Sequence, residues 1–414
     1  MIKVSDKVKK QRKRKDLLLN GITYFSSAIG VFVLVSIFVF VFSKGSGTLG
    51  LKLLTGDYWA KNYLLSVESS YNQIGNFKVP DNLDSSVYYS TRWGVGFIDA
   101  TDQNQEPVVL IETIDPNSPL MHLIDESVVS KDAKKAEIGY QVENLGYKDK
   151  NGVVKMAGNI MAQNAQEVAS ILDNDAQTLT NMYFKTPGGG IRGSIISTLY
   201  LIVVSLLIAL PLGIAAAIYL HEYAGKGKAT QIMRSAIEML TGVPSIIYGL
   251  MGVAVLFPIT TLFGAKTSNI LLGALTMAII LLPTIIRSTE EALLVVPQSL
   301  RDASLSLGAN QSQTIFKVIL PCAVPGILTG VLLSIGRVIG ESAALIYTMG
   351  TYVNDTPTLI SQGTSLAVQI YNIMSSEQPN FELACAISIV ILVFVLILNI
   401  AVKLLSKRFS KAWY

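Results

Sequence analysis

Two charged residues fall inside an otherwise apolar run near the C-terminal end of the sequence, Arg337 and Glu341. A charge in the middle of a membrane-spanning helix costs at least about 2.5 kcal/mol, so such residues usually have a function. A guanidinium stays charged at any relevant pH and binds a tetrahedral oxyanion through two parallel hydrogen bonds. The pattern therefore predicts that Arg337 faces a path for an anion. The alternative is a buried salt bridge between helices that never contacts a substrate.

The spacing of this pair, and a third charged residue, extend the prediction. Arg337 and Glu341 are four residues apart, which places them on one face of a helix, with the arginine first. This is the weaker order for an ion pair within one helix, so we expect partners on other helices or a water-filled path. Glu341 would hold Arg337 between turnovers or gate the path. Arg287, at the predicted cytoplasmic mouth, would guide the anion into the cell; snorkelling of its side chain to the interface is the alternative.

A polar stretch between two apolar runs, 270–286 and 327–345, is the second candidate site. It reads Asp302-Ala303-Ser304, three residues, Gly308, nine residues and then Val318-Ile319-Leu320-Pro321. Gly308 interrupts two helix-compatible halves, and Pro321 is expected to mark where the second half gives way to the next span. The pattern predicts a helix–turn–helix outside the bilayer that offers a rigid knob to a partner protein. An ordinary amphipathic loop between spans is the alternative.

The composition is that of a membrane protein with several spans. Of the 414 residues, 50% are hydrophobic and 15% are charged, against about 25% charged residues in soluble domains. Runs of about 20 apolar residues recur, the length that crosses a hydrocarbon core as a helix. We expect six transmembrane helices, near 17–42, 193–220, 236–258, 269–286, 326–350 and 382–402. The two cysteines fall at or inside spans and the two histidines lie far apart, so neither a disulfide framework nor a metal site is expected.

Basic residues set the predicted orientation in the membrane. Eight of the first fifteen residues are Lys or Arg, so 1–16 is expected to be a cytoplasmic tail that anchors the first span. Contact of this tail with nucleic acid or anionic lipid is the alternative, and no nucleic-acid partner is expected. Lysines and arginines also mark the loops 221–235 and 287–321 and the tail 407–414. Six spans place all of these segments, with both termini, in the cytoplasm.

Residues 43–190, between the first two spans, are predicted to form an extracytoplasmic insert domain. They carry 12 basic and 18 acidic residues, whereas the rest of the chain is basic. About 150 residues suffice for a domain with its own core. Strand patterns at 93–97, 108–114, 140–145 and 178–184, a turn at 115–119 and a helix at 165–172 favour an α+β fold. From Tyr88 to Lys185 this order resembles a PDZ-type domain, and a generic α+β insert is the alternative.

The expected fold is therefore an all-α polytopic membrane protein with six transmembrane helices, plus an α+β insert. The sequence Pro-Gly-Gly-Gly at 187–190 is the expected hinge from the insert into a five-helix core at 191–406. Prolines and glycines in or beside the spans, among them Pro211, Pro283 and Gly242, favour kinked helices that pack closely. Such a bundle suits a transporter that moves, although a static bundle would show the same pattern.

From residue 189 to the C-terminus the sequence resembles the PstA-type permease subunits of phosphate ABC importers. The resemblance rests on the segments 209–223, 242–246, 290–308, 320–330, 336–343 and 369–372, and implies an ABC importer permease core. It also implies that the polar stretch in 287–321 seats in an ATPase, through Arg301, Asp302, Ala303, Ser304, Leu307, Gly308, Ala309, Leu320 and Pro321. The chain departs from the family at Asp302, where Glu is usual, and mildly at Ser304 and Val318, where Ala and Ile are frequent; 43–190 also stands where the usual member has only a short loop.

The resemblance implies a subunit that moves inorganic phosphate into the cytoplasm across a bacterial-type cell membrane. Its implied partners are a PstC-type permease, cytoplasmic ATPase subunits, an external phosphate-binding protein and the lipid bilayer. The chain lacks Gly-x-x-x-x-Gly-Lys-Ser/Thr, so it is not expected to hydrolyse ATP, and no cofactor is expected. A permease for another oxyanion or small solute is one alternative, and a membrane-anchored PDZ-like scaffold or sensor is another. For the insert, docking of the binding protein or of a cell-envelope partner stands against a passive cap.

Overall fold

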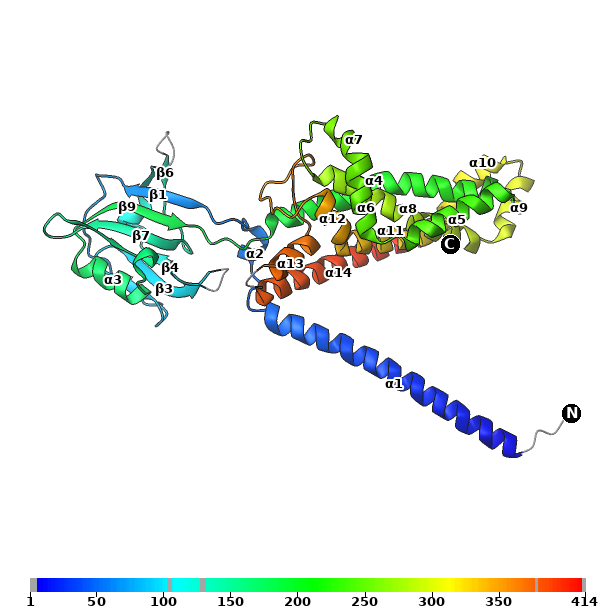
Figure 1. The fold of residues 1–414 in the computed structure, drawn as a ribbon, viewed down its shortest axis with the longest axis horizontal. Helices are drawn as coiled ribbons and strands as arrows, with labels where there is room; N and C mark the ends of the chain where they lie inside the picture. Colours follow the sequence, from blue (N-terminus) through cyan, green and yellow to red (C-terminus); the bar gives the residue numbers. More distant parts are fainter. Residues whose placement is uncertain (1–5, 103–105, 127–131, 226, 377–378, 412–414) are drawn as a thin grey trace.

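The computed structural model describes residues 6–102, 106–126, 132–225, 227–376 and 379–411. It has two parts, a curled β-sheet and a bundle of long helices (Figure 1). Helices α9 (Gln298–Ser306) and α10 (Gln311–Thr314) lie at the end of the bundle away from the sheet. The start of α1 (Asp6–Gly45) and the end of α14 (Phe381–Lys411) lie towards that same end. The predicted topology requires this arrangement, because it puts the sheet on one side of the membrane and the basic segments on the other.

The described residues form nine strands in one antiparallel sheet. They are β1 (Asn62–Val67), β2 (Tyr88–Ser90), β3 (Val95–Thr101), β4 (Pro107–Ile114), β5 (Leu123–Asp125), β6 (Ala133–Lys134), β7 (Gln141–Lys148), β8 (Val154–Ala157) and β9 (Thr178–Lys185). Their order is β2-β3-β4-β7-β9-β1-β5-β6, with β8 paired to β7. The first strand pairs with the last, and Asn62 lies opposite Lys185. The chain therefore enters and leaves the sheet side by side.

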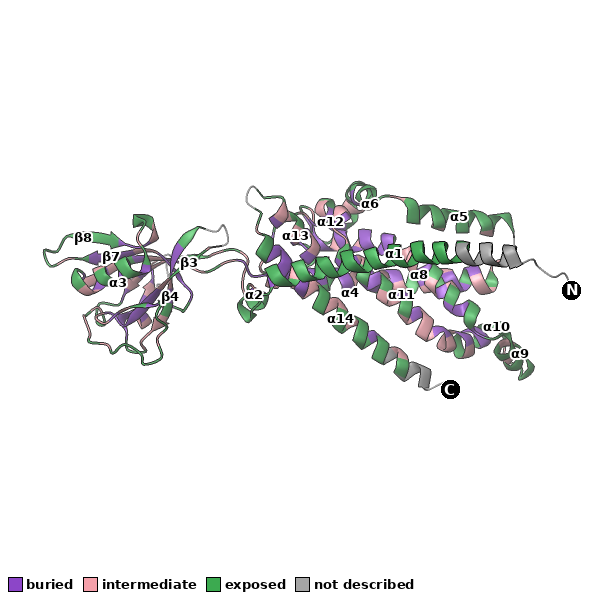
Figure 2. Ribbon diagram, turned by 90° about the horizontal axis from the view of Figure 1, so that it is seen from below, coloured by how far each residue is buried: buried purple, intermediate pink, exposed green. Residues whose placement is uncertain are grey.

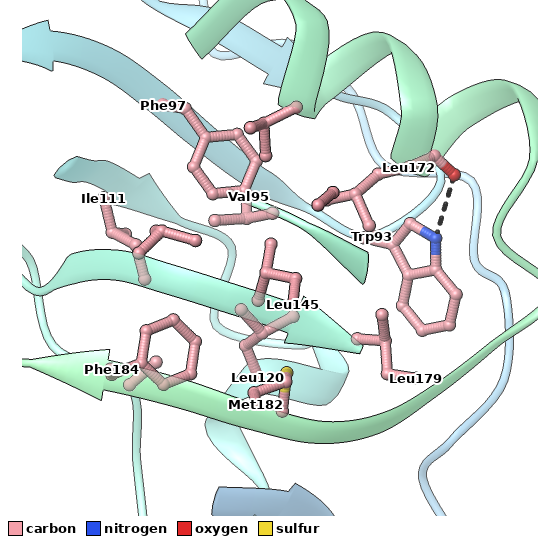
Figure 3. Packing of buried hydrophobic residues seen from close by; sticks show 14 of the residues in the cluster. Trp93, Val95, Phe97, Ile111, Leu120, Leu145, Leu172, Leu179, Met182 and Phe184 are labelled. Atoms are coloured by element: carbon pink, nitrogen blue, oxygen red, sulfur yellow. Dashed lines mark hydrogen bonds between the residues drawn. The ribbon is translucent and has the colours of Figure 1, made fainter. Parts of the chain in front are cut away.

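Helix α3 (Ala165–Asn174) covers one face of the sheet and closes its core (Figures 1 and 3). Trp93 and Phe97 are fully buried in this core, and the Trp93 indole N–H donates to the carbonyl of Leu172 over 3.1 Å. The Asp99 carboxylate accepts a hydrogen bond from the backbone at the start of α3. The Asp173 carboxylate, near the other end, accepts from backbone N–H groups just before β3. Both ends of α3 are thus fastened to the sheet.

Four of the predicted strands and the predicted helix of the insert are confirmed as β3, β4, β7, β9 and α3. The predicted turn leads into the 3-10 turn η1 (Pro119–Met121), where the Ser118 hydroxyl accepts from the backbone N–H of Leu120. Sequence reasoning missed β1, β2, β5, β6 and β8. Three of these have two or three residues each, too few for an alternating pattern to show. The PDZ-type resemblance stays a prediction.

The bundle is built from helices of very different lengths. Besides α1, α9, α10 and α14, it contains α2 (Leu51–Thr55), α4 (Arg192–Ile218), α5 (Lys228–Gly242), α6 (Ser245–Met251), α7 (Phe257–Thr261), α8 (Ile270–Val295), α11 (Leu320–Gly340), α12 (Ala343–Thr348) and α13 (Leu366–Met374). Three π-helical turns extend or join them: η3 (Tyr219–Tyr223), η4 (Gly252–Leu256) and η5 (Ile315–Ile319). The sheet also holds the short 3-10 turn η2 (Asn159–Met161).

Five helical segments of the described chain are long and apolar enough to cross a membrane. They are Lys15–Gly45, Arg192–Tyr223, Ile270–Val295, Gln311–Gly340 and Phe381–Leu404. A sixth span is possible only as a pair, Lys228–Gly242 and Ser245–Thr261, bent by 103°. The span expected near 236–258 is therefore not one straight helix, and it stays a prediction. Val243 is extended (ψ 128°) because a residue before proline avoids the helical region, and Pro244 has no N–H to donate.

Three predicted segment boundaries differ from the helix ends in the structure. Helix α1 runs without interruption from Asp6, so the predicted tail 1–16 and the first span share one helix. Helix α14 continues to Lys411, past the predicted end of the core at 406. The predicted span at 326–350 ends earlier, because α11 stops at Gly340 and α12 is a separate short helix.

Helices α4 and α8 form the centre of the bundle and pack more extensively than any other two elements of the described chain. Gly213 of α4 lies directly against Ile285 of α8, and a side chain there would collide with it. Leu201 and Met277 are fully buried between the helices of this core. In contrast, Figure 2 shows α1 exposed over most of its described length, and it meets α14 where Gly45 touches the backbone at Cys385. The α4–α8 pair is therefore the most extensively packed pair of elements in the described part of the bundle.

Candidate functional site

The predicted helix–turn–helix is present, and residues 298–314 are termed the elbow. Gly308 has a φ of +87°, the left-handed conformation that glycine adopts without strain, and it separates α9 from α10 as predicted. Helix α10 starts with a reciprocal cap: the Asn310 side chain accepts from the Gln313 N–H over 2.8 Å, and the Gln313 side chain accepts from the Asn310 N–H over 3.0 Å. Local sequence alone thus fixes the shape of the turn.

Pro321 lies where the second half of the elbow gives way to the next span, as predicted, but the helix is not interrupted there. One helical segment runs from Gln311 to Gly340, through α10, η5 and α11. Pro321 is in the first turn of α11, directly after the π-helical turn η5, where the regular hydrogen-bond ladder is already interrupted. The elbow is therefore continuous with α11, the helix that carries Arg337, and a displacement of the elbow can pass along α11.

The elbow is also fastened to the end of α4. The Arg301 guanidinium lies 2.7 Å from the Glu222 carboxylate in η3, and their side chains are only 16% and 11% exposed. The Gln311 side chain donates to the Glu222 carbonyl over 3.1 Å, and the Tyr223 and Ser312 hydroxyls are 3.2 Å apart. Sequence reasoning placed Arg301 among the residues that seat in the ATPase, but it points inward. Glu222 was not singled out, and its only signal was its place in the segment 209–223.

The other predicted contact residues divide into an exposed and a covered group. Asp302, Ala303, Leu307 and Gly308 are exposed, and the Leu307 side chain at the tip is 90% exposed. Ser304, Ala309, Leu320 and Pro321 are half-buried. The Ser304 hydroxyl is 2.9 Å from that of Thr314, which holds α9 against α10. The exposed group forms one tip, and the covered group supports it.

The charge of Arg337 is not balanced by an ion pair within the described residues. The residue is half-buried in α11, and its guanidinium makes no hydrogen bond or ion pair within the described residues. The spacing predicts that Glu341 lies on the same helical face as Arg337, and this is wrong. Helix α11 ends at Gly340, and Glu341 is extended (φ −77°, ψ 128°). The Glu341 carboxylate instead accepts from the N–H of Ala344 over 3.3 Å, in the first turn of α12. The two residues therefore lie on either side of a helix break.

Arg287 lines a cleft of about 420 Å³ between α5 and α8. Its guanidinium is 3.6 Å from the carboxylate of Glu291, and both side chains are largely exposed. Arg234, in the same cleft, lies 2.9 Å from Glu290. Each arginine thus has a carboxylate beside it, and the guiding role of Arg287 stays a prediction. Within the described residues, no group of three or more His, Cys, Asp or Glu side chains is arranged to hold a metal ion.

Comparison with known proteins identifies the helical part of the chain. Residues 209–411 match the family of binding-protein-dependent transport system inner membrane components. The chain is 34% identical over 239 residues to the probable ABC transporter permease protein YqgI of Bacillus subtilis, across 54% of this chain and 80% of that protein. It is 36% identical over 232 residues to the phosphate transport system permease protein PstA of Pasteurella multocida, across 55% and 81%. The chain belongs to this family as a PstA-type permease.

The matched region of the permease contains the elbow, Arg287 and Arg337, and it begins after the sheet. The phosphate transport system permease protein PstA 1 of Mycobacterium tuberculosis is 33% identical over 220 residues, across 52% of this chain and 70% of that protein. A solved structure of the inward-facing MetNI methionine ABC transporter covers 53% of this chain and 94% of its own, at 20% identity and a TM-score of 0.41. The sheet lies outside the family match, so its role must be sought in its own contacts.

Proposed function

We propose that this permease imports inorganic phosphate into the cytoplasm, driven by ATP that separate subunits hydrolyse. The observation that carries the proposal is the Arg337 guanidinium, which makes no hydrogen bond or ion pair among the described residues although its helix is long and apolar enough to span a membrane. An unpaired cation at such a place is costly, and a phosphate oxyanion offsets the cost by accepting two parallel hydrogen bonds. The relatives named as phosphate permeases support the choice of phosphate.

The face of α11 that carries Arg337 is open in this chain. Gly336 and Gly340 flank Arg337, and a side-chain atom added at either glycine would meet no atom within 4 Å. Nearby, α6 exposes apolar side chains such as Leu250 and Met251. A PstC-type permease would cover these surfaces, so the path for phosphate would run between the two permease subunits, with Arg337 on its wall.

The elbow supports a role for cytoplasmic ATPase subunits. Its tip presents the apolar side chain of Leu307 beside exposed polar residues, a surface suited to a protein partner. A partner that moves the elbow acts on α11 through the continuous helix and on α4 through Glu222. ATP binding can drive transport only if the ATPases bind the elbow differently in the two states of the permease. The two connections supply a physical route for that difference.

The proposed orientation puts the elbow in the cytoplasm and the sheet outside, in a bacterial-type cell membrane. The elbow lies at the end of the bundle where α1 starts, and the basic residues of the first fifteen precede the first span. An external phosphate-binding protein would then deliver its ligand at the end of the bundle that carries the sheet.

The test is phosphate uptake by the complete complex, purified with its partner subunits and placed in vesicles. Arg337→Gln should lower uptake at least about tenfold, the effect of losing hydrogen bonds between charged groups, while the complex still assembles. Arg337→Lys keeps the charge but loses the planar fork, and should retain part of the activity. Lys266→Gln, at an exposed cation on the sheet side of α8, is the matched control. Normal uptake by Arg337→Gln would refute the role of this residue.

The same preparation separates the remaining alternatives. Uptake of another oxyanion in preference to phosphate would keep the importer and change its substrate. A membrane-anchored scaffold would copurify without stoichiometric ATPase subunits, and that result would overturn the proposal as a whole.

A further inference from the structure

The two segments that connect the sheet to the bundle are tied to each other. The backbone N–H groups of Thr186, Gly189 and Gly190 donate to the carbonyls of Lys61, Tyr58 and Asp57 over 2.8, 2.9 and 3.0 Å. At the crossing point Gly190 lies on the backbone of Gly56, so closely that a side chain on Gly190 would overlap it. The predicted hinge at 187–190 is therefore part of a hydrogen-bonded ribbon, and not a free tether.

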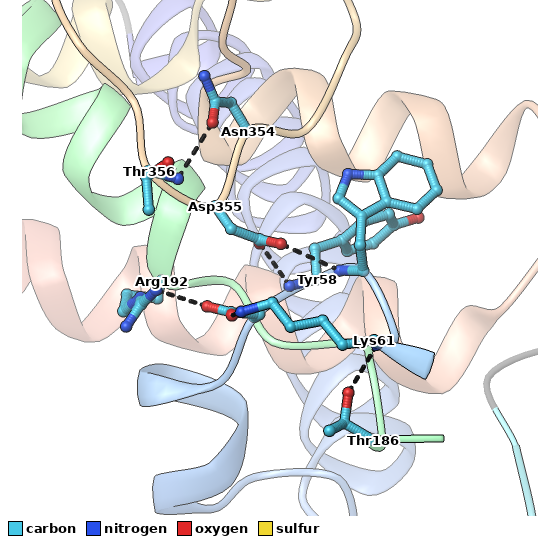
Figure 4. A network of polar contacts seen from close by, with 9 residues as sticks. Tyr58, Lys61, Thr186, Arg192, Asn354, Asp355 and Thr356 are labelled. Carbon is cyan, nitrogen blue, oxygen red and sulfur yellow. Dashed lines mark hydrogen bonds and ion pairs between the residues drawn. The ribbon is translucent and has the colours of Figure 1, made fainter. Parts of the chain in front are cut away.

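This ribbon is also held from the bundle side, by the loop 349–365 between α12 and α13, termed the outer loop (Figure 4). The Asp355 carboxylate accepts from the N–H of Tyr58 over 2.6 Å and from that of Trp59 over 3.4 Å. The Trp59 indole donates to the carbonyl of Val353 over 2.6 Å, and its ring stacks on Tyr352 at 5.7 Å. One carboxylate and one indole thus join the ribbon to the outer loop.

A second carboxylate connects the ribbon to α4. Asp57 lies 2.5 Å from the guanidinium of Arg192, the first residue of α4, and 2.6 Å from the ammonium of Lys61 (Figure 4). The Asp57 side chain is 20% exposed, so this ion pair is partly shielded from water. Asp57, Trp59 and Asp355 are termed the clamp.

The outer loop in turn covers the ends of the central helices. At the start of α8, the backbone N–H of Ile270 donates to the carbonyl of Ser361 over 3.2 Å. The N–H of Leu271 donates to the carbonyl of Leu359 over 2.8 Å. At the start of α4, Gly193 lies against the backbone of the outer loop at Asn354, where a side chain would not fit. The clamp therefore attaches the sheet to the same ends of α4 and α8.

The two ends of α4 carry the two attachments of this permease. Arg192 begins the helical segment and contacts the clamp, and Glu222 lies at its far end and contacts the elbow. Between them α4 packs along α8 through a continuous buried core. A tightly packed core transmits displacement as one body. The sheet and the elbow are thus connected through a single rigid pair of helices.

We propose that Asp355, with Asp57 and Trp59, positions the sheet as a rigid extension of α4 and α8, so that the sheet moves with the ATP-driven cycle of the permease. The inference rests on the proposed function as an ATP-driven importer. Whatever changes the orientation of the sheet then changes the coupling of ATP hydrolysis to transport, and the reverse holds as well, because coupling between two sites is reciprocal.

The first test measures a distance between the sheet and the bundle in the complete complex, by pulsed electron paramagnetic resonance. Spin labels replace Ser170, exposed on α3, and Leu262, 83% exposed after α7, in a background without Cys322 and Cys385 that retains uptake. The intact clamp should give one narrow distance distribution. Asp355→Ala should widen it roughly twofold or more, because the sheet can then turn on its two connecting segments.

The second test measures transport per ATP hydrolysed, in the same variants without labels. Asp355→Ala and Trp59→Phe, which keeps the ring but removes the N–H donor, should lower uptake per ATP by roughly fivefold or more. Asp355→Asn keeps the shape of the side chain, so its uptake per ATP should lie between that of these two variants and that of the intact complex. Asp81→Ala, at an exposed acid in the loop between β1 and β2, is the matched control and should change neither quantity.

Two results would overturn the inference. A distribution that stays narrow in Asp355→Ala and Trp59→Phe would show that the clamp does not fix the sheet. A distribution that widens without any loss of uptake per ATP would show that the position of the sheet is not coupled to transport. The distance between the sheet and the bundle can be measured without phosphate. If the intact complex failed to transport phosphate, that result would count against the proposed substrate, and the distance measurement would still test whether the clamp fixes the sheet.

Discussion

Arg301 and Glu222 join two segments that are 79 residues apart in the sequence, with 2.7 Å between guanidinium and carboxylate. The first residue belongs to the elbow and the second to the end of α4. Their side chains are 16% and 11% exposed, so the pair is shielded from water and its attraction is stronger than that of a surface pair. The elbow is therefore joined to two helices, to α11 through the chain and to α4 through this pair.

Breaking this pair should uncouple ATP hydrolysis from transport. Removing one partner of a shielded pair leaves the other charge poorly solvated, at a cost of about 3 kcal/mol. Glu222→Gln and Arg301→Gln should each lower uptake more than ATP hydrolysis, measured together in vesicles. The reversed pair, Glu222→Arg with Arg301→Glu, should recover part of the loss, because the attraction is restored.

The matched control is an ion pair of the same chemistry on the surface. Glu291 is 70% exposed beside Arg287, and such pairs contribute at most about 1 kcal/mol. Glu291→Gln should leave uptake per ATP unchanged. Equal losses in the buried and the exposed variants would mean that the Arg301–Glu222 pair has no special part in coupling.

A side chain at Gly308 should weaken the elbow through the backbone conformation, without a clash with any neighbouring atom. An added Cβ would meet no atom within 4 Å, so the cost of Gly308→Ala is that of the left-handed backbone alone, about 1 kcal/mol. Gly308→Asn should cost less, because asparagine tolerates this conformation better. The measurement is the affinity of the permease for its ATPase subunits. Equal affinity in both variants and the parent would show that the turn does not need a left-handed residue.

The tip of the elbow should lose its partner when its apolar side chain is replaced by a charge. Leu307 is 90% exposed, and an aspartate there would have to be desolvated on binding the ATPase. Leu307→Asp should reduce copurification of ATPase subunits by about tenfold or more. Leu262→Asp is the control, since Leu262 is 83% exposed at the opposite end of the bundle. Loss of the ATPases in both variants would point to general damage and contradict the assignment.

Local features of the site could be predicted from the sequence. Gly308 and the polar residues around it determine the turn between α9 and α10, and the lengths of the apolar runs determine five of the spans. Alternating strands and the helix α3 were predicted in the sheet for the same reason, because their patterns are written in neighbouring residues.

Features that depend on distant contacts could not be predicted in this way. The inward direction of Arg301 depends on Glu222, which a spacing rule cannot relate to it. The break between Arg337 and Glu341 is accompanied by a local contact, from the Ala344 N–H to the Glu341 carboxylate, which helical periodicity does not reveal. The bend after α5 differs, since Pro244 was a local signal for it and the run of apolar residues outweighed that signal.

The clamp should loosen at alkaline pH. The hydrogen bond from Lys61 to Asp57 raises the pKa of the Lys61 ammonium above its usual value of 10.5. Because the folded pKa is raised, this stabilisation is fully present below the ordinary pKa and is lost as the pH rises through the raised value. The distance distribution between sheet and bundle should therefore stay constant up to about pH 10 and widen above it. Lys61→Met has no ammonium at this position, so its distance distribution should widen less above about pH 10 than that of the parent. The same widening with pH in Lys61→Met and in the parent would contradict the role of Lys61.

The crossing of the two connecting segments should be the most sensitive point of the junction between sheet and bundle. A Cβ on Gly190 would fall on the backbone of Gly56, which cannot move aside as a flexible side chain could. Overpacking of this kind costs about 1–3 kcal/mol, so Gly190→Ala should separate the two segments locally and leave the core of the sheet folded. Limited proteolysis should then cut at 186–191 faster than in the parent. Gly50→Ala, where an added Cβ meets no atom within 4 Å, is the control and should be cut at the parental rate. Equal rates in both variants would mean that the segments are already apart in solution, contrary to the ribbon in the structure.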